Sequence, residues 1–106
     1  MNSFEKIMVD AIDSIEETCT IFYQQKNEEG YQLLDGTIKL LTSIIDELYM
    51  LKSKGINIGI NENELMMRLS DAMDALQAKD TILLSDIMKF EVLELIKIVK
   101  GTIPNN

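Results

Sequence analysis

Apolar residues recur at steps of three and four through four long segments of the chain, and this spacing constrains the fold more than any other feature. Residues three and four positions apart share one face of an α-helix, so each segment predicts an amphipathic helix. No strand-like alternation extends beyond the short run INIGI of residues 56–60. The pattern predicts an all-α fold, an antiparallel four-helix bundle in which residues 1–106 form one domain. The expected helices span about 4–25, 28–53, 62–78 and 81–100.

Residues that typically begin and end helices stand at the boundaries of these segments. Side chains able to accept hydrogen bonds from free backbone amides predict four N-caps, at Ser3, Asn27, Asn61 and Asp80. Gly101, followed by Pro104, predicts the end of the last helix. Gly36 lies inside the second predicted helix and costs about 1 kcal/mol relative to alanine. It either allows close approach of a neighbouring helix or is merely tolerated.

The last predicted helix carries the widest apolar surface. Projected at 100° per residue, its apolar arc covers more than half of the circumference and leaves Leu93 and Ile96 outside. Such a helix is expected to lie centrally in the bundle or to be covered by a second chain. The residues of this predicted arc are Leu83, Leu84, Ile87, Met88, Phe90, Val92, Leu95, Ile98 and Val99.

Two acidic residues, Glu91 and Glu94, project inside this apolar arc, where an unpaired carboxylate is costly. Arg68, the single arginine of the chain, is the predicted partner of Glu91 because the third and fourth helices should pack antiparallel. The two glutamates therefore predict either structural ion pairs, with side chains that reach solvent, or positions that face a binding partner.

Methionine is abundant, with seven residues in 106, and several gather on the last two predicted helices. Flexible thioether side chains fill irregular gaps in cores and also form adaptable binding surfaces. Both interpretations stay open at this point. Together with the two glutamates they give five candidate partner-binding residues: Glu91, Glu94, Met66, Met67 and Met88.

The formal net charge is −8, from 18 Asp and Glu against 10 Lys and Arg. This excess disfavours binding to nucleic acids or anionic membranes, so neither is expected as a partner. Residues 1–30 hold seven acids and two bases, and residues 61–80 hold five acids and two bases, whereas the other segments are balanced. If the first and third helices share one side of the bundle, they form an acidic face. That face is either simply solvated or attracts a basic partner.

The residue types needed for most catalytic and metal sites are missing from the sequence. The chain has no histidine, and its single cysteine, Cys19, lies on an apolar stripe where a buried hydrophobic role is expected. The acidic run from Asn61 to Glu64 lacks the residue order of a calcium loop. We therefore expect no enzyme activity, cofactor or metal. A ligand-binding regulator or a carboxylate-based enzyme is the alternative.

The cellular location follows from the same composition. Neither a secretory signal nor an apolar stretch long enough to span a bilayer is apparent, and a lone thiol suits a reducing compartment. The expected location is cytoplasmic.

Residues 76–91 contain an alanine-leucine helix that ends at Lys79-Asp80, then Leu83-Leu84-x-Asp86 and the pair Phe90-Glu91. This hairpin resembles small helical-bundle proteins of Gram-positive bacteria, and the resemblance covers about residues 28–98. These proteins are similar to the helical export chaperones encoded beside flagellar genes. The resemblance implies a non-enzymatic protein and no catalytic residue. From the wide apolar surface of the last helix and the nearby methionines, we expect an adaptor or chaperone-like protein that binds an amphipathic helix of a protein partner, or a second copy of itself, there.

Overall fold

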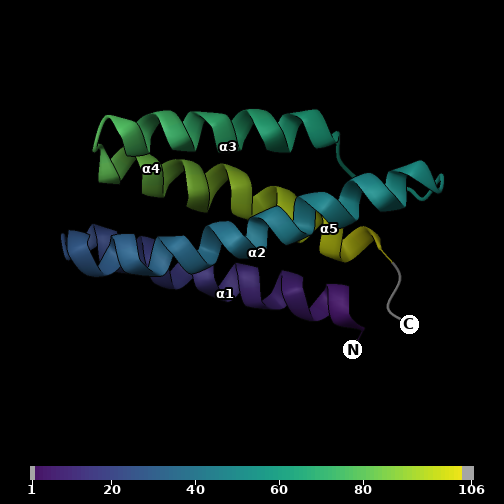
Figure 1. The fold of residues 1–106 in the computed structure, drawn as a ribbon, viewed down its shortest axis with the longest axis horizontal. Coiled ribbons are helices and arrows are strands. Elements are labelled where there is room, and N and C mark those ends of the chain that lie inside the picture. Colours follow the sequence, from purple (N-terminus) through teal and green to yellow (C-terminus); the bar gives the residue numbers. More distant parts are fainter. Residues whose placement is uncertain (1, 104–106) are drawn as a thin grey trace.

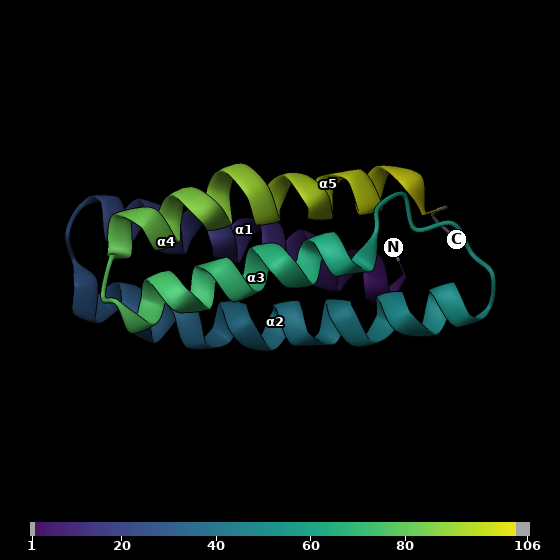
Figure 2. The same cartoon turned by 90° about the horizontal axis from the view of Figure 1, so that it is seen from above.

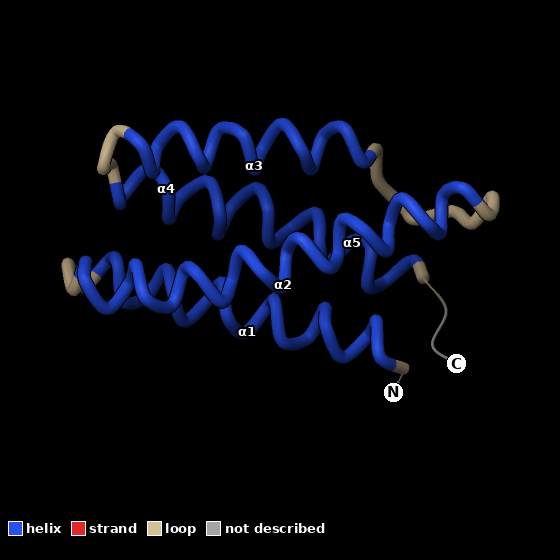
Figure 3. The backbone as a smooth tube through the Cα atoms, in the orientation of Figure 1, coloured by secondary structure: helices blue, strands red, loops and turns tan. Residues whose placement is uncertain are grey.

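A computed structural model describes residues 2–103, and every regular element in that range is helical (Figures 1 and 3). This confirms the all-α fold class. The last predicted helix is continuous but is divided by a π-helical turn, η1, into α4 and α5. In chain order the elements are α1 (Ser3–Tyr23), α2 (Asn27–Ser53), α3 (Glu62–Gln77), α4 (Thr81–Ile87), η1 (Met88–Val92) and α5 (Leu93–Thr102).

The chain runs up and down through four antiparallel helical rods (Figures 1 and 2). The α1 helix packs along α2 and along the α4–η1–α5 rod, while α3 packs mainly on α4 and η1. Figures 1 and 2 together place α1 and α3 at diagonal corners of the bundle. The two acidic helices therefore do not share a side, so the condition for a single acidic face is not met. The order of the short connections sets this arrangement, and the charge pattern alone does not reveal it.

The helix ends agree with the sequence in part. The Asp80 side chain accepts from the Leu83 amide at 3.0 Å and Asn61 accepts from the Asn63 amide at 2.9 Å, which confirms both predicted caps. Asn2 caps α1 in place of Ser3, with its Oδ1 2.7 Å from the Glu5 amide. Asn27 is the first residue of α2, and its predecessor Lys26 makes no side-chain cap. The last helix continues through Gly101 to Thr102, and Pro104 lies outside the described residues.

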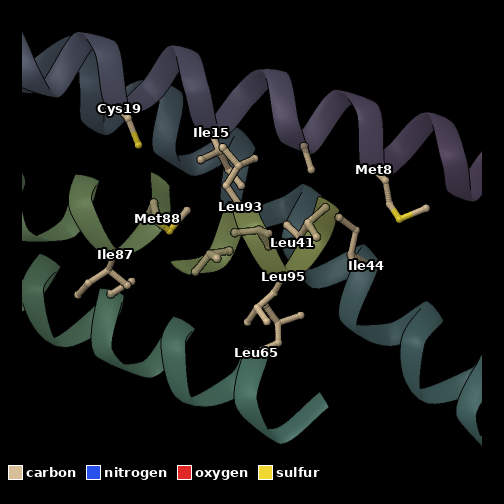
Figure 4. Close-up of a cluster of buried hydrophobic side chains, with 14 of the residues drawn as sticks. Met8, Ile15, Cys19, Leu41, Ile44, Leu65, Ile87, Met88, Leu93 and Leu95 are labelled. Carbon is tan, nitrogen blue, oxygen red and sulfur yellow. The ribbon is translucent and has the colours of Figure 1, made fainter. Parts of the chain in front are cut away.

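The π-turn η1 changes which side chains of the last helix reach the core. Its extra residue rotates the following helix by about 100°, the angle between successive residues of an α-helix. Leu93 and Ile96, outside the predicted arc, are consequently buried at 3% and 0% exposure. In Figure 4, Leu93 lies toward Ile15 of α1 and Leu95 toward Leu65 of α3. Ile98, inside the predicted arc, is instead 48% exposed.

Two glycines of α2 have opposite roles. A Cβ atom built on Gly30 would lie 2.5 Å from the Phe22 ring, and nothing lies within 4 Å of one built on Gly36. Phe22 is buried and meets Tyr31 edge-on, with ring centroids 5.3 Å apart. Gly30 thus gives the aromatic ring its space at the turn between α1 and α2. Gly36 permits no close approach and is simply tolerated.

Replacing each glycine by alanine separates these roles. We expect Gly30→Ala to lower the free energy of unfolding by about 1–3 kcal/mol, because the buried Phe22 ring must shift. The matched control Gly36→Ala should raise it by about 0.5–1 kcal/mol, because alanine favours an exposed helical position. Urea denaturation of both variants checks the pair, and equal effects at the two positions would contradict the packing described for Phe22.

Candidate interaction surface

The predicted pair between the third and fourth helices is present. Arg68 Nε lies 3.4 Å from Glu91 Oε1, and a second nitrogen of the guanidinium, Nη1, lies 3.7 Å from Asp71 Oδ2. The side chains of Arg68 and Glu91 are 35% and 40% exposed. An ion pair with this much solvent access contributes at most about 1 kcal/mol. The pair links α3 to η1.

The other four candidate residues fall into different environments. Glu94 is exposed, contrary to its position inside the predicted apolar arc, because the π-turn rotates α5. Met66 and Met67 are exposed on α3, at 41% and 61%. Met88 is 2% exposed and contacts the core, so it is not part of any exposed surface. The structure therefore brings no two of Glu94, Met67 and Met88 into a common site.

Among residues 2–103, Phe90 is the most exposed large apolar side chain, at 63%, although the sequence pattern places it in the predicted buried arc. It lies in the π-turn, where the only sequence signal was the aromatic-Glu pair of residues 90–91. Other exposed large apolar residues accompany it on the half of the molecule formed by α3, α4 and α5: Met66, Met67, Ile82, Leu83 and Ile98.

A shallow groove, here the α1–α5 groove, runs between α1 and the second half of the last helix. Its α1 wall consists of Val9, Ile12, Asp13, Glu16 and Thr20. Its opposite wall consists of Lys89, Phe90, Leu93, Glu94, Lys97, Lys100 and Gly101. The charged groups of the first wall are all carboxylates, whereas those of the second wall are mainly lysine ammonium groups. The groove thus joins an exposed aromatic ring, a partly apolar lining and two charged edges.

One end of this region contains partly buried polar groups that connect two helices. The Tyr23 phenol donates a hydrogen bond to Asp86, and Lys89 Nζ lies 5.7 Å from the centre of the Tyr23 ring. Burial, and then the Asp86 carboxylate, raise the pKa of the Tyr23 phenol above its usual value. Both contacts link the end of α1 to the α4–η1 segment.

The thiol of Cys19 donates to the Ser85 carbonyl at 3.5 Å and is 2% exposed, which confirms its predicted burial. Burial raises its pKa to about 11, so the thiol is protonated at neutral pH. A protonated, enclosed thiol is a weak nucleophile. Cys19 therefore acts as a small core residue.

At the other end of the molecule, Glu62 is almost fully buried at the start of α3 and forms an ion pair with Lys52 of α2. The hydrogen bond from Lys52, and then the backbone amide of Glu62, lower the pKa of this carboxyl below its usual 4.5. The pair joins the two helices across the longest connection, residues 54–61. Sequence reasoning placed Glu62 only in an acidic cluster.

Within residues 2–103, no group of three or more His, Cys, Asp or Glu side chains could together hold a metal ion. None of the helices in that range is long and apolar enough to cross a membrane. The carboxylates are spread over separate surfaces and do not converge on one point.

Comparison with known proteins identifies the family. The family model described as "Domain of unknown function (DUF8042)" matches residues 1–102, so the chain belongs to this family. No curated protein and no solved structure matches the chain.

The Lys52–Glu62 pair predicts a specific pH dependence of stability. The folded-state pKa of Glu62 lies below that of the unfolded chain, so its contribution is complete above about pH 5 and is lost as the pH falls through the folded-state pKa. We expect wild type to lose more unfolding free energy than Glu62→Gln between about pH 6 and about pH 3.

Urea denaturation at the two pH values measures this difference. Glu64→Gln, at an exposed neighbour that forms no ion pair among the described residues, is the matched control. If Glu62→Gln and Glu64→Gln lose stability equally, the role assigned to the Lys52–Glu62 pair is wrong.

Proposed function

We propose that this family member is a non-enzymatic protein-interaction module, an adaptor or chaperone-like helical bundle. It binds an amphipathic helix of a protein partner or a second copy of itself. The observation that carries the proposal is the Phe90 side chain, which stands 63% exposed beside the α1–α5 groove. Full burial of a phenylalanine side chain contributes about 1.5–3 kcal/mol, so a partner that covers it gains affinity directly.

An amphipathic helix fits this surface better than a small ligand does. Helical partners bind through apolar side chains spaced three and four apart along a shallow groove, whereas small molecules need concave, mostly enclosed sites. The α1–α5 groove is open and extends from Val9 and Gly101 to Thr20 and Lys89. Exposed methionines on α3, Met66 and Met67, supply a second adaptable apolar area.

Two further observations support this assignment. The hairpin of residues 76–91 resembles that of Gram-positive helical-bundle proteins similar to flagellar-type export chaperones, which act by binding other proteins. The single buried thiol, Cys19, suits a reducing cytoplasm, where such adaptors work.

Affinity capture from the native cell tests the proposed function. Tagged wild-type protein should recover a stoichiometric amount of a partner protein or of its own untagged copy. We expect Phe90→Ala to lower the recovery at least about tenfold, because it removes the exposed aromatic contact of the groove. Tyr49→Ala is the matched control, since Tyr49 is 47% exposed on α2 and lies outside the groove.

The proteins and small molecules recovered are identified by mass spectrometry. A bound metabolite without any protein partner would refute the proposal, as would equal recovery by wild type and Phe90→Ala. Circular dichroism establishes that both variants retain their helical content before the comparison is made.

A further inference from the structure

We infer that the α1–α5 groove is the contact surface for a second copy of this chain. This inference rests on the proposed function and names the occupant of the same surface. Two copies related by a two-fold axis parallel to the groove pack α1 of each copy on α5 of the other.

The two walls carry opposite charges of equal size. The α1 wall has two carboxylates, Asp13 and Glu16. The α5 wall has three lysines and Glu94, which gives a net charge of +2 against −2. Among the described residues no ion pair within 4 Å joins the two walls. Within one chain the charged groups of the two walls therefore form no ion pair across the groove, and Lys89 alone lies over aromatic rings, those of Tyr23 and Phe90.

With a suitable two-fold axis, the oppositely charged walls make the groove of one copy complementary to the groove of a second copy. A two-fold axis that lies along the groove exchanges the two walls and preserves the level of each residue along the axis. Asp13 and Lys97 line the same stretch of the groove, so Asp13 of one copy meets Lys97 of the second copy, and the reverse pair forms as well. An axis across the groove would instead set carboxylate against carboxylate, which electrostatic repulsion disfavours.

The apolar part of the groove fits the same arrangement. Val9 and Ile12 on α1 and Leu93 on α5 give the groove an apolar lining, and Phe90 stands beside it. The two-fold axis brings Phe90 of both copies to one level, where each ring is covered by the opposite chain. Exposed aromatic side chains that a partner covers contribute a large share of the binding energy in many interfaces.

The oligomeric state of the purified protein tests the inference. Light scattering coupled to size exclusion should give twice the 12.1 kDa chain mass for wild type at low salt. We expect Asp13→Lys and Lys97→Asp each to weaken dimerisation at least about tenfold, because each sets like charges against one another. Asp46→Lys and Lys26→Asp change the net charge equally at exposed positions outside the groove and should leave the dimer intact.

Mixing the two groove variants isolates the contact between chains. In a mixed dimer, Lys at position 13 of one chain meets Asp at position 97 of the other, and the remaining pair is the wild-type one. Within each chain the like charges persist, so a repair inside one chain cannot explain the result. We expect the mixture of Asp13→Lys and Lys97→Asp to form a dimer although neither variant does so alone.

Three outcomes would overturn the inference: a monomeric wild-type protein, a dimer that the groove variants do not weaken, or a mixture that stays monomeric. The proposed function fails separately, because native capture can still recover a heterologous partner when the purified chain is monomeric. Circular dichroism of all variants confirms that the expected loss of dimer does not arise from unfolding.

Discussion

The extra residue in the π-turn Met88–Val92 governs how the second half of the last helix meets the rest of the bundle. An insertion of one residue into a helix rotates everything that follows by about 100°. Here the rotation brings Leu93 and Ile96 into the core and turns Glu94 and Ile98 toward solvent. A straight helix would instead place both glutamates inside the predicted apolar arc. The insertion therefore keeps a carboxylate out of the core, where it would be costly.

The same rotation shapes the surface on which the proposed function rests. With Leu93 directed toward α1, Glu94 and Lys97 lie along the edge of the α1–α5 groove, and Phe90 stands beside them. The groove combines one exposed aromatic ring with charged edges of opposite sign. Aromatic groups supply most binding energy in such interfaces, whereas exposed charges set the partner and its orientation.

Local sequence signals predict the helices and several contacts between them. The spacing of apolar residues gives four helices with ends correct to within about two residues, since the pattern and the caps act within single segments. The Arg68–Glu91 pair is confirmed because an antiparallel hairpin with a short turn fixes the register of α3 on η1. Cys19 is buried as predicted.

The features that the sequence does not reveal depend on long-range packing. The segment Met88–Val92 contains no glycine or proline, so nothing marks a π-turn there. In the sequence, Gly36 stands out as a glycine inside a predicted helix, but no side chain packs against it. Gly30 has the larger effect on packing, because the Phe22 ring of another helix occupies the space that a side chain would need. The positions of α1 and α3 at opposite corners follow from the path of the chain. A distribution of charges along the sequence does not determine that path.

The burial of Ile96 and the exposure of Ile98 provide the most direct test that the π-turn rotates α5, because a straight helix predicts the reverse. In a Cys19→Ala background, Ile96→Cys and Ile98→Cys each carry one thiol, and the rate of thiol labelling of the native protein reports its access to solvent. If the π-turn rotates α5 as described, the thiol at position 98 reacts nearly as fast as in the unfolded chain, and the thiol at position 96 is protected. Faster labelling at position 96 than at position 98 would contradict the π-turn and the groove derived from it.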